Sequence, residues 1–189
     1  MLFVVAVTGA SGSIYTRRLL EELKRAGHTT LLLVSDEAKN VMKYEGENLQ
    51  RIIGLATQAF SEHDMDSPAS SGSVKTEGMI VVPCSMKTVS AIAHGLSDNA
   101  ITRAADVTLK ERRTLILVPR ETPLSIVHLR NLLRAAQAGA AILPAMPAFY
   151  TRPRTIDDMV NFIVGRVLDL INVPHNLYPR WSEPSTEKE

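Results

Sequence analysis

The sequence predicts an α/β fold in a single domain, with helices on both faces of a parallel sheet. Two observations favour this class. Strand-like and helix-like segments alternate along the 189 residues, which is typical of parallel strands joined by crossover helices. The strand-like segments are also continuously apolar, as expected where both faces of a sheet are buried. A chain of this length can bury a substantial core without disulfides.

The expected strands are the short apolar runs, each bounded by turn residues or by a change to helical periodicity. They are Leu2–Val7, Thr29–Val34, Met79–Val82, Thr114–Val118 and Ala141–Leu143.

Helices are expected between these strands and after the last one. The first covers about Ser11–Ala26, and Gly27 is a typical helix stop. Others are expected over residues 98–113 and from Thr122-Pro123 to near residue 139. The last begins after Thr155 as N-cap, and its apolar residues recur with a 3.6-residue period.

One polar stretch, residues 61–78, interrupts this alternation. It is rich in Ser, Asp, Gly and Pro, and a loop this long is typically a lid, a contact arm or disordered. Residues 182–189 are predicted to be a flexible tail. The expected domain therefore covers residues 1–181.

Composition excludes several function classes. Basic and acidic side chains nearly balance, with a net charge of +1, so neither nucleic acid nor an anionic membrane is a predicted partner. Cys84 is the only cysteine, which excludes an internal disulfide and fits a reducing compartment. The apolar N-terminus is too short for a membrane span and lacks a basic leader. We therefore expect a cytoplasmic protein without a membrane span. No His, Cys, Asp and Glu residues show metal-site spacing, so no metal is predicted.

The first candidate site is the turn Thr8-Gly9-Ala10-Ser11-Gly12, directly after the first strand. A glycine turn there leaves backbone N–H groups free at a helix N-terminus, where phosphate binds. The full G-x-G-x-x-G fingerprint is absent, as is the Tyr-x-x-x-Lys pair of a short-chain dehydrogenase. A tight turn without a ligand, in which Ser11 only caps the helix, is the alternative.

The second candidate is Arg120-Glu121, directly after the strand Thr114–Val118. It offers a cation for an anion and a carboxylate for proton transfer, and charges rarely follow a buried strand merely to be solvated. The carboxyl ends of parallel strands meet at one edge of the sheet, where ligands bind. Both candidates therefore predict one crevice.

Two further segments can contribute to this crevice. Ser85 and Thr88, after the third strand, suit a phosphate or an isoalloxazine edge, and ordinary helix capping is the equally open alternative. Arg103 and Lys110 share one helix face and can reach an anion, unless they belong to a solvated basic face.

Taken in order, several blocks of the chain resemble the UbiX-like flavin prenyltransferase family, formerly described as aromatic acid decarboxylases. These blocks are Thr8–Gly12, Pro83–Thr88, Arg103–Val107, Leu109–Arg113, Val118–Pro123, Pro147–Tyr150 and Pro179–Trp181. The resemblance extends from about Phe3 to Trp181. It implies a flavodoxin-like, Rossmann-like fold, similar to that of the flavodoxin-like cysteine decarboxylases. It also implies a homododecamer with FMN at subunit interfaces.

The activity implied by the resemblance joins a dimethylallyl group from dimethylallyl phosphate to N5 and C6 of reduced FMN. The prenylated FMN would pass to a separate decarboxylase, of the ubiquinone or aromatic-acid pathway type.

The resemblance also assigns residues. The implied FMN contacts are Gly9, Ala10, Ser11, Ser35, Ser85, Met86, Lys87, Thr88 and Arg120. The implied donor-phosphate ligands are Arg103, Lys110, Tyr150 and Arg166. The implied catalytic group is Glu121, Glu45 and Ser11, with Glu121 as the preferred proton donor or acceptor.

Three other functions stay open from the sequence. A flavin-dependent decarboxylase of the cysteine type shares the fold, but it would leave Lys110, Arg120, Tyr150 and Arg166 without a role. A non-catalytic FMN carrier would bind flavin without chemistry. A direct aromatic acid decarboxylase would convert an aromatic acid without a partner enzyme.

Overall fold

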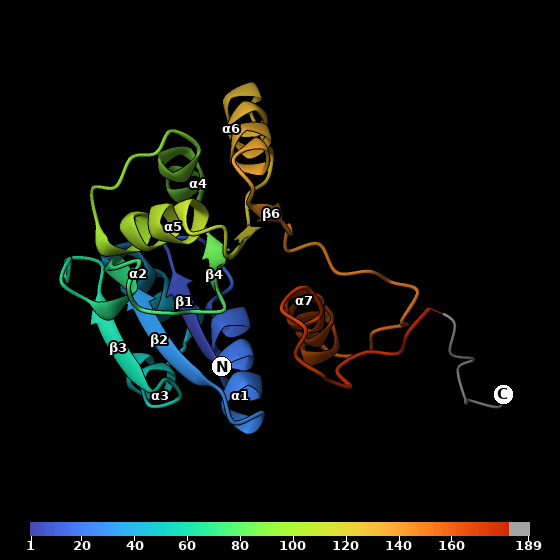
Figure 1. Cartoon of the computed structure of the whole chain (residues 1–189). Helices are drawn as coiled ribbons and strands as arrows, with labels where there is room; N and C mark the ends of the chain where they lie inside the picture. The colour runs from blue at the N-terminus through green and yellow to red at the C-terminus, as the bar shows by residue number, and fades with distance from the viewer. Residues whose placement is uncertain (182–189) are drawn as a thin grey trace, which may run out of the picture.

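The structure, a computed structural model, describes residues 1–181. Within that range a parallel sheet is ordered β3-β2-β1-β4-β5-β6 (Figure 1). The strands are β1 Leu2–Val7, β2 Thr29–Val34, β3 Gln58–Ser61, β4 Gly78–Cys84, β5 Thr114–Pro119 and β6 Ala141–Ile142. The α/β class, the parallel sheet and the single domain are confirmed, and the predicted tail 182–189 lies outside the described residues.

Helices cover both faces of the sheet, as predicted. They are α1 Ser13–Arg25, α2 Asp36–Glu45, α3 Leu49–Ile53, α4 Met86–Ala93, α5 Ala100–Lys110, α6 Ile126–Gln137 and α7 Ile156–Leu170. Residues of α1, α2, α3 and α7 pack into the core on one face. Residues of α4, α5 and α6 pack on the other, and Figure 1 shows α7 beside α1 and α6 beside α4.

Two predicted helix starts are wrong. Helix α1 begins at Ser13, and its N-cap is Gly12 in the left-handed conformation (φ 116°), so Ser11 is no cap. Helix α6 begins at Ile126, because Ser125 forms a capping box with His128, three residues after the expected start. The capping box at Thr155 before α7 is confirmed.

Residues 61–78 are ordered against the end of α5. The Arg113 guanidinium donates to the Gly72 and Val74 carbonyls at 2.8 and 2.7 Å. A 3-10 helix, Pro68–Ser70, forms one turn of the segment. This stretch is therefore ordered, and whether it acts as a lid or as a contact arm stays a prediction.

The strand order reverses between β1 and β4, since β2 and β3 lie on one side and β5 and β6 on the other. Ligands of open α/β sheets bind outside the carboxyl ends at such a switch point. The buried Thr8 hydroxyl joins the two strand ends. It donates to the Pro83 carbonyl at 3.0 Å and accepts from the Ser85 N–H at 2.7 Å. Among residues 1–181, no helix combines the length and apolar character that crossing a bilayer requires.

Candidate active site

Two adjoining cavities open at the switch point. The larger, about 350 Å³, is lined by Gly9, Ala10, Ser11, Val41, Tyr44, Glu45, Ser85, Met86, Arg120 and Glu121. The smaller, about 220 Å³, is lined by Thr8, Gly9, Ser35, Glu37, Glu62, Ser85, Lys87, Thr88, Ala91, Asp98, Asn99, Ile101 and Thr102. Because they share Gly9 and Ser85, they form one crevice. It contains the predicted flavin contacts and both predicted acids.

The N-terminus of α1 is not free to bind a phosphate, contrary to the prediction. The Glu45 carboxylate accepts from the Gly12 N–H at 2.6 Å and from the Ser13 N–H at 2.9 Å. It also accepts from the Ser11 hydroxyl at 2.6 Å and from the Ser13 hydroxyl. The sequence could not show this, because Glu45 lies more than thirty residues away, at the end of α2.

These contacts keep Glu45 ionised. Burial acts to raise the pKa of its carboxyl, but the hydrogen bonds from Ser11, Ser13 and Gly12 outweigh burial and hold that pKa below its usual value. The N-terminal dipole of α1 favours the same charge. The carboxylate thereby fixes the Ser11 hydroxyl at the wall of the crevice.

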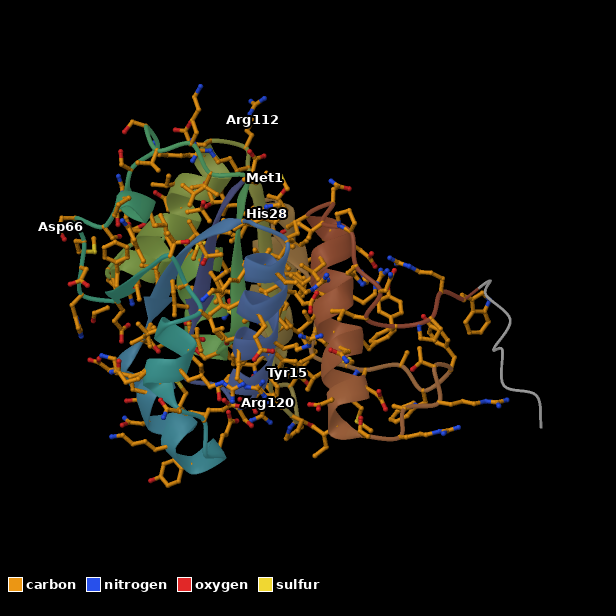
Figure 2. The ribbon with its side chains drawn as sticks, turned by 90° about the horizontal axis from the view of Figure 1, so that it is seen from below. Met1, Tyr15, His28, Asp66, Arg112 and Arg120 are labelled. Atoms are coloured by element: carbon orange, nitrogen blue, oxygen red, sulfur yellow. The ribbon has the colours of Figure 1, made fainter. Side chains whose placement is uncertain are left out.

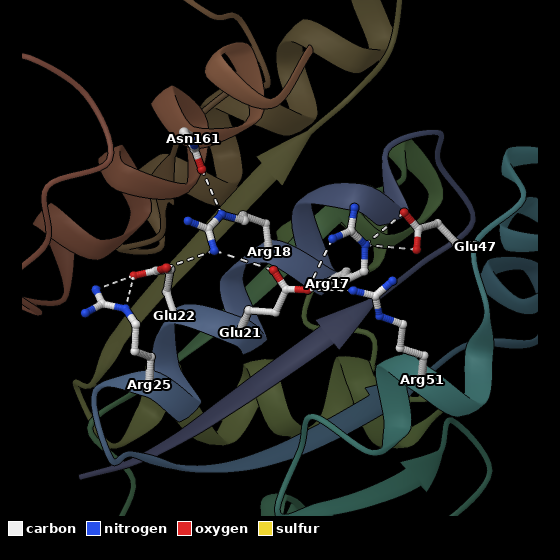
Figure 3. Close-up of polar contacts among 8 residues, drawn as sticks. All are labelled: Arg17, Arg18, Glu21, Glu22, Arg25, Glu47, Arg51 and Asn161. Atoms are coloured by element: carbon white, nitrogen blue, oxygen red, sulfur yellow. Dashed lines mark hydrogen bonds and ion pairs between the residues drawn. The ribbon is translucent and has the colours of Figure 1, made fainter. Parts of the chain in front are cut away.

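A second ion pair holds the end of α2 against α1. The Arg17 Nε on α1 lies 3.1 Å from both carboxylate oxygens of Glu47, just beyond α2 (Figure 3). Gly46 between Glu45 and Glu47 turns the chain with a left-handed φ of 72°. Glu45 therefore reaches α1 because the turn behind it is anchored.

Arg120 carries a buried nitrogen without a partner. Its Nε is buried and makes no hydrogen bond to any described residue. Buried N–H groups are usually satisfied, so this one is available to a ligand in the crevice that it lines. Tyr15, which the sequence reasoning missed, lies at the same end of the sheet, away from Met1 and His28 (Figure 2). Burial raises the pKa of the Tyr15 phenol above its usual value, although the nearby Arg120 guanidinium acts to lower that pKa.

Close packing explains two glycines of the turn. A Cβ on Gly9 would lie 2.5 Å from the Glu37 Cβ. A Cβ on Gly12 would lie 2.8 Å from the Tyr15 ring. The turn therefore keeps its backbone near the crevice because side chains of α1 and α2 fill the space behind it.

Ser35 and Ser85 cap the helices that border the smaller cavity. Each hydroxyl accepts from the N–H three residues on, which is ordinary N-capping. The capping alternative for Ser85 and Thr88 is therefore correct, and both residues nevertheless line the crevice.

The four predicted donor ligands do not line the crevice of this chain. Arg103 and Lys110 lie on α5, with 41% and 50% of the side chain exposed, and are paired with Asp106 and Glu111. Tyr150 and Arg166 belong to the C-terminal region around α7. The structure thus brings the predicted flavin contacts and the predicted acids together in one crevice. The four predicted donor ligands lie outside that crevice.

Cys84 and one acidic cluster complete the ionisable groups of interest. Cys84 is fully buried, and burial raises the pKa of its thiol, so it is no nucleophile.

Among the described residues, Asp36, Glu62 and His63 offer ligand atoms within 4.8 Å of one another, which sequence spacing did not reveal. His63 already bonds to Asp36 at 2.8 Å, and Glu62 accepts from the Asp36 N–H. The cluster is held by its own hydrogen bonds.

Comparisons with known proteins agree with this geometry. The Flavoprotein family model matches residues 2–168. The flavin prenyltransferase UbiX of Thermoplasma acidophilum is 49% identical over 182 residues, which cover 96% of this chain and 100% of that protein. The chain belongs to the flavin prenyltransferase family.

Solved structures of the family have the same fold. AnUbiX in complex with FMN and dimethylallyl pyrophosphate superposes with a TM-score of 0.94 and 45% identity, covering 97% of this chain and 98% of that one. A dodecameric FMN-dependent UbiX-like decarboxylase from Escherichia coli O157:H7 gives 0.93 and 43%, covering 97% and 100%. The peptidyl-cysteine decarboxylase EpiD, at 16% identity and a TM-score of 0.63, shares the fold alone with this flavin prenyltransferase family member.

Proposed function

We propose that this chain transfers a dimethylallyl group from dimethylallyl phosphate to N5 and C6 of reduced FMN. The observation that carries the proposal is the crevice itself, since Arg120 with its unpartnered Nε, the ordered Ser11–Glu45 pair and Glu121 all line one cavity. The FMN and dimethylallyl pyrophosphate bound to AnUbiX, at 45% identity, support the same assignment.

The residues present fit a bound flavin. Arg120 offers a buried donor for a flavin oxygen or phosphate, and Gly9, Ala10 and Ser11 present backbone close to the crevice. Lys87 and the helix N-termini at Ser35 and Ser85 surround the smaller cavity, where a phosphate suits their charge and dipoles. When bound, the reduced flavin supplies the electron-rich ring that attacks the allylic carbon.

Donor binding requires cations and hydrogen-bond donors, and we assign these roles to the cations Arg103, Lys110 and Arg166 and to the Tyr150 hydroxyl. Breaking the C–O bond of the allylic phosphate leaves negative charge on oxygen, and each preorganised donor contributes about 3 kcal/mol in a dry site. Because one chain holds these residues apart, we propose that neighbouring copies bring them to one crevice. The dodecameric E. coli relative supports a dodecamer here.

Closing the second bond adds C6 of the flavin to the double bond of the prenyl group, so one proton must reach the other alkene carbon and one must leave C6. Glu121 lines the crevice, and its carboxylate accepts only the Thr122 N–H, at 2.9 Å, among the described contacts. It can therefore take the proton from C6, unless the departing phosphate does. Ser11, held by Glu45, can pass a proton along the same wall. The product would leave for a separate decarboxylase that uses prenylated FMN, and we infer a cytoplasmic location for both.

The test is mass spectrometry of the flavin extracted after anaerobic incubation with reduced FMN and the donor. We expect a flavin heavier by one prenyl unit, with the monophosphate and the diphosphate compared as donors. Unmodified FMN would favour the carrier function. Loss of CO₂ from an aromatic acid supplied alone would favour a direct decarboxylase, the activity given in the name of the E. coli relative.

A further inference from the structure

Two of the proposed donor ligands share one wall built around α7. The Tyr150 ring packs edge-on against Phe162 of α7, with ring centroids 6.0 Å apart, and against Trp181 at 4.8 Å. Phe162 in turn contacts Tyr178 at 5.0 Å. Arg166 lies one helical turn after Phe162 and therefore on the same face of α7. The C-terminal residues 175–181 thus complete a wall that carries both Tyr150 and Arg166.

The Asp169 carboxylate is the centre of the polar part of this wall. It accepts from the Tyr178 hydroxyl at 2.5 Å and from His175 Nε2 at 3.0 Å. Arg180 binds both of its oxygens, at 2.8 and 2.9 Å, and Arg166 Nη1 lies 3.2 Å away. His175 is buried, with 1% of its side chain exposed. One carboxylate therefore ties α7 to residues 175–180 and to Arg166.

A close backbone approach adds a steric part to the same arrangement. A Cβ on Gly165 would lie 2.6 Å from the Tyr178 ring and 2.8 Å from His175 Cε1. The absence of a side chain at Gly165 lets the C-terminal turn lie directly against α7. Charge at Asp169 and space at Gly165 are thus independent requirements for one geometry.

The charge balance shows what the carboxylate does for Arg166. Two guanidinium groups, those of Arg166 and Arg180, contact the Asp169 carboxylate. An amide at position 169 would retain the size of the side chain but remove the negative charge that faces Arg166. Arg166 would then lose the contact that fixes its direction, because its other hydrogen-bond partner among the described residues, the Tyr178 hydroxyl, lies at 3.5 Å.

We propose that Asp169 is a positioning residue, which holds Arg166 and the C-terminal turn so that Arg166 and Tyr150 meet the phosphate of the prenyl donor. This inference rests on the donor-binding role proposed above. Asp169 does not itself touch the donor. It acts through Arg166 directly and through Tyr178 and Phe162 on the Tyr150 ring.

The test compares steady-state kinetics of the full-length wild type, Asp169→Asn and Asp169→Glu with reduced FMN and dimethylallyl monophosphate. We expect Asp169→Asn to raise the KM for the donor about tenfold, with kcat changed less than about twofold, because ground-state binding is what a misdirected arginine loses. FMN affinity, followed by flavin fluorescence, should not change. Asp169→Glu should recover the low KM in part, since it restores the charge.

Asp157→Asn is the matched control, because it removes an acid of the same helix from the exposed first turn and should leave KM unchanged. Gly165→Ala tests the steric requirement without altering charge and should also raise KM. If Asp169→Asn does not fold, the KM of Gly165→Ala tests whether the C-terminal turn positions the donor ligands.

The outcomes separate the two proposals. An inactive wild type overturns the proposed function, and the role of Asp169 with it. An active wild type with unchanged KM in Asp169→Asn overturns the positioning role alone. Equal losses of FMN affinity and turnover would also overturn it, because they would mean a general structural defect.

Discussion

The crevice at the switch point and the proposed donor ligands, Arg103, Lys110 and Arg166, are organised in opposite ways. In the crevice, Glu45 reaches across from α2 to accept hydrogen bonds from Ser11, Gly12 and Ser13 of a different segment. The donor cations instead pair with acids of their own elements, as Lys110 does with the adjacent Glu111. The residues of the crevice are thus held together by contacts between distant segments, whereas the donor-binding cations are exposed and paired locally.

This difference indicates how the two substrates would bind. Exposed ion pairs such as Arg103–Asp106 contribute only about 0–1 kcal/mol, so an incoming phosphate can displace the carboxylate at little cost. The Glu45 contacts are short and numerous, and a ligand would not readily replace them. The crevice residues should therefore keep their arrangement when FMN binds, whereas the donor-binding cations should change partners.

The largest effect should come from the carboxylate at the centre of the crevice. We expect Glu121→Gln to retain FMN but to slow prenyl-FMN formation by about 10²- to 10⁴-fold, the usual range for losing a general acid or base. Single-turnover mass spectrometry measures the rate, and Glu77→Gln, an exposed change elsewhere, is the control. Loss of FMN without a separate effect on turnover would contradict the role of Glu121.

Replacing a donor cation should have the next largest effect and can test whether copies share a site. We expect Lys110→Met to lower kcat/KM for the donor by about 10²- to 10³-fold, because it removes one charged donor from the phosphate. FMN affinity should stay the same.

Coexpression sharpens this second test. If a crevice takes Lys110 from a neighbouring copy, assemblies that mix Lys110→Met with Glu121→Gln chains contain some sites with both native residues. Activity above that of either variant alone is expected. Activity no greater than the average of the two would place both residues in the site of a single chain.

The sequence was sufficient to predict the parts of the fold that have strong local signals. Strands β1 and β2 lie at the predicted bounds because uninterrupted apolar runs admit no other assignment. Strand β3 was missed, because an edge strand of four half-exposed residues carries too little apolar pattern. Helix α6 starts late because the Ser125 capping box prevails over the Thr122-Pro123 signal.

The site residues also divide into those that the sequence could predict and those that it could not. The residues at strand ends, such as Gly9, Ser85 and Arg120, could be predicted because topology alone brings carboxyl ends together. The occupation of the α1 N-terminus by Glu45 could not, since it depends on the path of α2. Tyr15 was missed for a similar reason, because its nearness to Arg120 arises only when α1 packs against the sheet.

The third prediction concerns the unpartnered nitrogen of the crevice. A charged hydrogen bond contributes about 1.5–3 kcal/mol, so Arg120→Met should weaken FMN binding by about 10- to 100-fold. Titration of the apoprotein with FMN, followed by fluorescence quenching, measures this. Arg112→Met is the matched control, because that side chain is exposed and lies at the opposite end of the sheet from Arg120 (Figure 2). Equal weakening in both variants would mean that Arg120 has no specific contact with the flavin.

The fourth prediction uses the pH dependence of Glu45. Its folded pKa lies below the ordinary 4.5, so its stabilising contribution is complete above about pH 4.5 and is lost as the pH falls through the folded pKa. The stability difference between wild type and Glu45→Gln should therefore be constant near neutrality and shrink in acid. Urea unfolding at several pH values measures it. A difference that grows as the pH falls would contradict the bound, ionised carboxylate.

The smallest effect should come from the ion pair behind Glu45. Arg17 and Glu47 are mostly buried, at 18% and 15% side-chain exposure, so their contact should contribute about 1 kcal/mol. Arg17→Gln should then lower Tm by about 2–4 °C, as expected for a domain of this size.

Arg51→Gln is the matched control, since Arg51 belongs to the same ionic cluster (Figure 3). Its side chain is 63% exposed, and its contact with Glu21 is long, at 3.4 Å. Calorimetry should detect no shift for it. Equal shifts would assign the stability to the net charge of this surface rather than to the Arg17–Glu47 contact. Turnover should change little in Arg17→Gln, because four hydrogen bonds still hold Glu45 at α1.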